Sequence, residues 1–209
     1  MGARGVGHIA SLCRTARPTV GIVTTVGKAH TSEFGNVEAV ALGKGELVES
    51  LPVEGFAVLN ADNPYVASMA DRTEASVVTF GDAGEVRAEA VSIAEDLIPS
   101  FRLASPWGDV NVRLGVQGDH LIPNALAAAA AALPLGVSLE RLAAGLEEPD
   151  RSPMRMAMKT APSGARIIDD TYNANPLSVA GAIEALAIVP AGRTVAVLGV
   201  MAELGDSSR

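Results

Sequence analysis

Aromatic residues are scarce in this chain of 209 residues, with four Phe, two Tyr and one Trp, or 3 % of the sequence. Hydrophobic residues nevertheless make up 48 %, so a sizeable core is possible, and Ala, Val and Leu must supply it. This length allows one large domain, or one domain with part of another.

Cysteine is rare, and basic runs and long apolar runs are missing. The single Cys13 excludes an internal disulfide, suits a helix face, and is compatible with a reducing compartment. A net charge of −8 without a Lys- or Arg-rich run argues against nucleic-acid binding. The longest apolar run, residues 125–137, is too short to cross a bilayer, and no secretory h-region is visible. We expect a cytoplasmic protein without membrane insertion.

Strands and helices alternate over the first 80 residues, which predicts a parallel α/β sheet. The continuous apolar run at 19–26 is typical of a strand buried on both faces. The predicted strands are 19–26, 55–59 and 76–80, and the predicted helices are 7–16, 37–51 and 65–70.

The pattern then changes to short alternating strands, which predict a small antiparallel sheet. These strands are 86–93, 100–104 and 110–116, and residues 106–109 join the last two as a hairpin. Helices at 121–133 and 138–146 follow.

The charged, proline-bearing stretch 147–153 is a plausible linker, so we place one domain at 1–149 and another at 150–209. The second has predicted strands at 154–160, 166–169 and 194–198 and a helix at 177–189. These strands are too few for a normal sheet, so we expect a chain that is truncated at its C-terminus.

The stretch Asp169-Asp170-Thr171-Tyr172-Asn173-Ala174-Asn175-Pro176 is the strongest candidate site. A helix start explains Asn175 as N-cap and Pro176 as the first helical residue. It does not explain Asp169, Asp170 and Tyr172. Polar side chains at the end of a strand are typical of the ligand edge of an α/β sheet.

Three further residues are weaker candidates. His30 follows a predicted strand, although alone it is more simply a hydrogen-bonded loop residue. Lys44 lies on a helix between Gly43 and Gly45, where a close approach of another group is one explanation and a solvated lysine is the simpler one. Asn124 lies just inside a helix start, where it stabilises little and favours a ligand role.

Several common sites are excluded by spacing. Five residues separate Gly21 from Gly27, where a P-loop needs four, and Ala29 replaces its Ser or Thr. The chain has no Cys/His zinc spacing and no Gly-x-Ser-x-Gly elbow.

Taken in order, the motifs resemble the Mur ligases over nearly the whole chain. The similar segments are 1–5, 7–10, 26–30, 33–35, 44–46, 59–62, 118–125, 169–176, 197–199 and 203–205. The string Asp169 to Pro176 points to the branch of this family that adds D-alanyl-D-alanine.

The resemblance implies an α/β fold: a central domain with a helix-flanked parallel sheet and a small antiparallel sheet, then the start of a Rossmann-like C-terminal domain. It implies an ATP- and Mg²⁺-dependent amide ligase of peptidoglycan synthesis, monomeric at full length. The substrates would be UDP-N-acetylmuramoyl-tripeptide and D-alanyl-D-alanine, joined through an acyl phosphate.

The resemblance also assigns roles. His30 and a carbamylated Lys44 would serve the metal, and Arg155 would contact ATP phosphate. Asp170 would bind the ribose. The remaining nucleotide residues would be Asn124, Tyr172, Asn173 and Asn60.

The chain departs from the family pattern at Leu121, Met154 and Val200, where Asn, Gly and an acidic residue are common. The family's P-loop, metal-binding Glu and N-terminal domain are not in this sequence, so we expect no ligase activity from it alone. The alternatives are another Mur-type ligase, acting on folate or polyglutamate, and a non-catalytic remnant that binds a nucleotide or a partner weakly.

Overall fold

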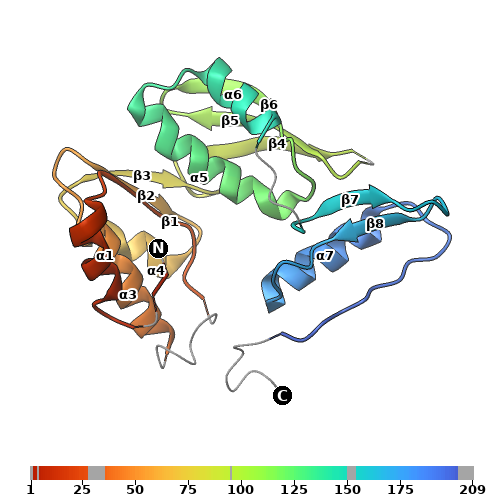
Figure 1. Ribbon diagram of the computed structural model, residues 1–209. Coiled ribbons are helices and arrows are strands. Elements are labelled where there is room, and N and C mark those ends of the chain that lie inside the picture. The colour runs from red at the N-terminus through yellow and green to blue at the C-terminus, as the bar shows by residue number, and fades with distance from the viewer. Residues whose placement is uncertain (1, 4, 28–35, 95, 150–153, 202–209) are drawn as a thin grey trace.

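The computed structural model describes residues 2–3, 5–27, 36–94, 96–149 and 154–201. Two sheets and their helices form the first part of the chain, and a hairpin with one helix forms the last part (Figure 1). The expected α/β class is confirmed. Among these residues no helix is long and apolar enough to span a membrane.

The first sheet is parallel, as predicted, with the strand order β1–β2–β3. Its strands are β1 (Val20–Val23), β2 (Phe56–Asn60) and β3 (Ser76–Phe80). β1 lies at an edge of the described sheet and Ile22 is exposed, so the prediction of burial on both faces is wrong for this strand.

Each face of this sheet has its own core, because successive residues of a strand point to opposite faces. Ala57 and Leu59 pack with the helices α3 (Val37–Glu49) and α4 (Pro64–Ala67). Val58, between them, packs with α5 (Ile122–Ala132) on the other face. The remaining N-terminal helix, α1 (His8–Ala16), lies beside α3 and buries Cys13, as its sequence predicts (Figure 1).

The second sheet is antiparallel, again as predicted, with the strand order β4–β5–β6. Its strands are β4 (Arg87–Ile93), β5 (Pro99–Ser105) and β6 (Gly108–Arg113), and α6 (Leu139–Glu147) packs on it. Phe101 and Leu103 join Phe80 of β3 in one core, so the two sheets form one unit. Short 3₁₀ turns complete it at Ser68–Arg72, Asp119–Leu121 and Leu133–Leu135.

The last part of the chain is a hairpin, β7 (Ala157–Thr160) with β8 (Arg166–Asp169), followed by α7 (Pro176–Ile188). The helix begins as the sequence predicts. Asn175 caps it, and the backbone N–H of Ser178 donates to the Asn175 side chain at 3.0 Å while Ser178 Oγ accepts from the Asn175 N–H at 3.1 Å.

The predicted strand at 194–198 does not form. Residues 193–200 have no regular structure, and the side chains of Val197 and Val200 are 92 % and 91 % exposed. β7 and β8 pair as an antiparallel hairpin.

One apolar contact joins the two parts. Leu97, between β4 and β5, is 1 % exposed and packs in a cluster with Met156, Ala185 and Val189. Its backbone is fixed by the bond from its N–H to Ala94 O and by the bond from the Gly118 N–H to its carbonyl, both at 2.9 Å. The first part of the chain thus contributes a core residue to the last part.

Candidate functional site

Lys44 lies at the carboxyl end of β1. Its half-buried side chain on α3 donates a hydrogen bond from Nζ to the carbonyl oxygen of Thr25, at 2.7 Å. Burial lowers the pKa of Lys44, because a charged ammonium is costly away from water. The simpler interpretation of Lys44 as a freely solvated charge is therefore wrong.

Two amide side chains converge on the same segment. Asn60, at the end of β2, donates from Nδ2 to Thr24 O at 2.8 Å. Asn63, three residues later, donates to Val26 O at 2.8 Å and also caps α4. The carboxyl edge of the parallel sheet therefore gathers Lys44, Asn60 and Asn63 around residues 24–26, where α/β folds bind ligands.

His30 lies outside the described residues, so its predicted role at this edge stays a prediction. Among the residues that are described, no three His, Cys, Asp or Glu side chains are grouped closely enough to hold a metal ion. The described oxygen atoms that accept hydrogen bonds there are the carbonyls of residues 24–26 and the Thr25 hydroxyl. These do not complete a Mg²⁺ site on their own.

A close approach does explain Gly45, next to Lys44. The guanidinium of Arg72 lies across α3 at this point and donates to Ala41 O at 3.2 Å and Leu42 O at 3.0 Å. A Cβ on residue 45 would lie 1.9 Å from Arg72 Nη1. A side chain at residue 45 would displace the Arg72 guanidinium from this position, so the packing of Arg72 accounts for Gly45 without a ligand.

Glu46, the next residue, is a buried carboxylate that sequence reasoning did not single out. It is 7 % exposed and accepts hydrogen bonds from the backbone N–H groups of Gly7 and Ala10, the latter at 2.9 Å. Glu46 thus binds the beginning of α1 to the helix that carries Lys44. In the sequence, Glu46 was marked only as part of the segment 44–46 that resembles the Mur ligases.

A second group of predicted residues comes together at the open end of the β7–β8 hairpin. The register pairs Ala157 with Asp169, so the residues just outside the hairpin, 154–156 and 170–172, lie opposite one another. The Arg155 guanidinium lies over the Tyr172 ring, 4.1 Å from its centroid. Asp170 Oδ1 accepts from the Met156 N–H at 3.0 Å.

The two remaining predicted residues lie near helix starts without joining either group. Asn124 is exposed in the first turn of α5, and its side chain makes no hydrogen bond to another described residue. Asn173 is exposed, and its Oδ1 accepts from the Ala174 N–H at 2.9 Å. Asp119 accepts from the His120 N–H at 2.8 Å and does not cap α5.

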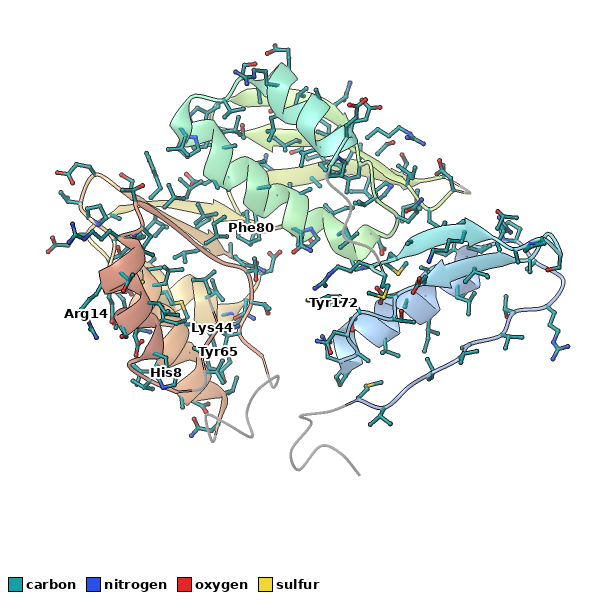
Figure 2. The ribbon with its side chains drawn as sticks, in the orientation of Figure 1. His8, Arg14, Lys44, Tyr65, Phe80 and Tyr172 are labelled. Carbon is teal, nitrogen blue, oxygen red and sulfur yellow. The ribbon has the colours of Figure 1, made fainter. Side chains whose placement is uncertain are left out.

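The two groups lie in different parts of the chain. Figure 2 shows Lys44 beside the parallel sheet and Tyr172 beside the hairpin. Each group has an open polar character suited to a phosphorylated or carboxylated ligand: an amine and amides in the first, a guanidinium with a carboxylate in the second. No hydrogen bond joins them among the described residues.

Comparison with known families gives two matches. A model of the Mur ligase middle domain matches residues 1–132, and a model of the Mur ligase glutamate ligase domain matches residues 154–209. The domain boundary predicted at 149/150 falls between these matches and stays a prediction.

Relatives match the whole chain. The UDP-N-acetylmuramoyl-tripeptide–D-alanyl-D-alanine ligase of Mycobacterium tuberculosis is 45 % identical over 216 residues, which cover 100 % of this chain and 42 % of that protein. The Escherichia coli ligase of the same name is 34 % identical over 212 residues, covering 100 % and 46 %.

Solved structures agree. MurF from Acinetobacter baumannii has a TM-score of 0.91 at 34 % identity, covering 100 % of this chain and 46 % of that one. The MurF ligase from Thermotoga maritima in complex with ADP has a TM-score of 0.87 at 28 % identity, covering 100 % and 48 %. The chain thus spans less than half the length of these relatives, and it belongs to the Mur ligase family.

Proposed function

We propose that this chain is the central and C-terminal portion of a ligase that adds D-alanyl-D-alanine to UDP-N-acetylmuramoyl-tripeptide in peptidoglycan synthesis. The observation that carries the proposal is the match of all 209 residues to a ligase of that name at 45 % identity. In this proposal the protein acts in the cytoplasm, where its nucleotide-linked substrate is made.

ATP would bind between the two groups of residues, with its phosphates near Arg155 and its ribose near Asp170. The donor set supports this. A guanidinium forms paired charge-assisted bonds to phosphate, and one carboxylate oxygen of Asp170 makes no hydrogen bond to a described residue, so it is available for a hydroxyl. Bound ATP would supply the phosphoryl group that activates the substrate carboxylate. Asn60, Asn124, Tyr172 and Asn173 complete the proposed nucleotide site.

Lys44 would act as a carbamate. The ammonium first loses a proton to water. The neutral amine then attacks CO₂, an N–C bond forms as one C=O π bond breaks, and a second proton leaves to water, so a cation becomes an anionic oxygen donor. The lowered pKa of Lys44 favours this step because it raises the fraction of neutral amine. His30 would share the Mg²⁺ with this carbamate.

The test is a hybrid enzyme. The segment of the M. tuberculosis ligase that aligns with this chain is replaced by residues 1–209, and phosphate release from ATP is measured with UDP-N-acetylmuramoyl-tripeptide. We expect release that depends on D-alanyl-D-alanine and is lost in Lys44→Ala, but is retained in the surface control Arg141→Ala. A folded hybrid that accepts glutamate and not D-alanyl-D-alanine would refute the substrate assignment.

The isolated chain should not turn over, because within these 209 residues nothing matches a P-loop to hold the β- and γ-phosphates. The same phosphate assay on the purified chain checks this expectation. Turnover that disappears in Lys44→Ala would show that the chain carries a complete site.

A further inference from the structure

Arg155 is presented by an unusual backbone. Met154 and Met156, the residues on either side of it, have φ angles of +60° and +48°. Residues other than glycine rarely adopt this left-handed backbone conformation. Those that do cluster at functional sites, where the surrounding structure must hold them.

The stretch from Asp170 to Tyr172 holds both flanking residues. The Tyr172 N–H donates to Met154 O at 3.1 Å, and the Met156 N–H donates to Asp170 Oδ1 at 3.0 Å. The Met156 side chain is 2 % exposed, in the cluster that contains Leu97. The backbone around Arg155 is therefore fixed from two directions.

Among the described residues, the contact with the Tyr172 ring is the only cation–π, ion-pair or hydrogen-bond interaction of the Arg155 side chain. Its guanidinium lies 4.1 Å from the ring centroid, and no described carboxylate forms an ion pair with it. Tyr172 is 59 % exposed, so core packing does not explain an aromatic residue here. A guanidinium that stacks through its face keeps its N–H edges free for a planar or tetrahedral anion.

We infer that Tyr172 is a positioning residue, which holds the Arg155 guanidinium so that its N–H edges meet the phosphates of the nucleotide. The inference rests on the proposed function, in which Arg155 contacts phosphate. A positioning role can be told apart from a direct contact of Tyr172 with the adenine base. In the positioning role, the contribution of Tyr172 to nucleotide affinity depends on both the phosphates and Arg155. An exposed cation–π pair contributes enough to change affinity about two- to fivefold.

The experiment measures dissociation constants of adenosine, ADP and ATP for the 209-residue chain by titration calorimetry. Four variants are compared: Tyr172→Phe, Tyr172→Leu, Arg155→Ala and the double variant Tyr172→Leu/Arg155→Ala. Arg141→Ala controls for the loss of one positive charge at an exposed helix position. Equal melting temperatures establish that the variants are folded.

We expect Tyr172→Leu to weaken ADP and ATP about two- to fivefold and to leave adenosine unchanged. Tyr172→Phe keeps the ring and should match the original chain. In the Arg155→Ala background, Tyr172→Leu should cause no further loss, because the two side chains act as one unit.

Three results would overturn the inference while leaving the proposed function in place. The first is an equal loss of affinity for adenosine and ADP, which shows a direct contact with the base, and the second is an equal loss in Tyr172→Phe and Tyr172→Leu, which assigns the effect to the hydroxyl. The third is a loss of affinity in Tyr172→Leu that persists when Arg155 is also replaced. If Arg155→Ala leaves ADP and ATP affinity unchanged, or if the chain binds none of the nucleotides, the proposed phosphate role fails and the inference falls with it.

A measurement without nucleotide tests the stack itself. The ring current of Tyr172 should shift the side-chain NMR resonances of Arg155 in the free chain. The shift should persist in Tyr172→Phe and vanish in Tyr172→Leu. Identical Arg155 resonances in all three chains would overturn the inference, whatever the binding data show.

Discussion

Replacing Glu46 tests how α1 is fixed to the helix that carries Lys44. Glu46 is the one charged side chain that is buried among the described residues, and it accepts from the N–H groups of Gly7 and Ala10. The N-cap, Gly7, has no side chain of its own to cap the helix. Since a hydrogen bond to a charged group contributes about 1.5–3 kcal/mol, Glu46→Ala should lower the free energy of unfolding by about 3–5 kcal/mol.

Glu46→Gln separates charge from shape. The amide keeps one acceptor oxygen for one N–H and turns its NH₂ towards the other, so we expect a loss of about 1.5–3 kcal/mol, roughly half that of the alanine variant. Thermal and urea unfolding followed by circular dichroism measure both values. A loss of 3 kcal/mol corresponds to a fall of roughly 6–12 °C in melting temperature for a domain of this size.

Hydrogen exchange locates the effect. In Glu46→Ala the amides of Gly7 and Ala10 should lose protection, while those of β2 keep theirs. Glu184→Gln, on the exposed face of α7, is the control and should unfold like the original chain. If Glu46→Ala melts like the original and the exchange of Gly7 and Ala10 does not change, the carboxylate does not hold α1 and the reasoning is refuted.

Three further predictions concern single positions. Leu97→Ala should lower the free energy of unfolding by about 2–5 kcal/mol and speed amide hydrogen exchange in α7, because the buried Leu97 side chain packs against that helix. Leu135→Ala, at an exposed site, should change neither quantity. Because the pKa of Lys44 is lowered in the folded chain, its amine binds a proton more tightly in the unfolded chain, and stability should rise with pH between the lowered pKa and 10.5. The midpoint of urea unfolding, measured across this pH range, should rise for the original chain and should not show this rise for Lys44→Met. Met154→Gly should raise the free energy of unfolding in urea by about 0.5–1 kcal/mol, because relief of the strain at a left-handed φ exceeds the cost of the added entropy of the unfolded chain. Met154→Ala should not raise it, because alanine keeps the Cβ that causes the strain.

The fold of residues 7–147 could be predicted because its signals are local. Continuous apolar runs mark the strands of the parallel sheet, and alternation marks Phe101 and Leu103 as inward residues of the antiparallel sheet. The end of β1 could not be placed from the pattern. Apolar residues continue to Val26, but pairing with β2 ends at Val23, and pairing partners lie far away in sequence.

The failed strand at 194–198 has the same cause. Thr194 to Leu198 has a high β propensity, yet a strand exists only where another strand offers its N–H and C=O groups. In the described structure β8 pairs with β7, and residues 193–200 lie exposed without a partner. Propensity identified a segment able to form a strand, and tertiary contacts decided that it does not form one here.

The candidate site was predictable where it depends on a turn and unpredictable where it depends on register. The cap at Asn175 follows from local rules, and the polar cluster before it marked Asp170 and Tyr172. The stack of Arg155 on Tyr172 does not follow, because 17 positions separate them and only the register that pairs Ala157 with Asp169 brings them together. The same holds for Glu46, whose partners at Gly7 and Ala10 are more than 30 positions away.

The motif Gly118-Asp119-His120 is explained by packing between the two parts of the chain. The His120 ring lies against Gly181 of α7, where a Cβ would be 3.3 Å from both Cγ and Nδ1 of the ring, and Gly118 turns the chain with a φ of +100°. Nδ1 of His120 is buried and makes no hydrogen bond to any described group, whereas a hydrogen-bonding role would require a partner for it. Since Asn124 follows His120 by about one helical turn and Tyr172 precedes α7, this contact sets the spacing of the two helix starts that carry the proposed nucleotide residues. His120 therefore contributes to the position of α7, and the nucleotide roles proposed for Asn124 and Tyr172 stay predictions.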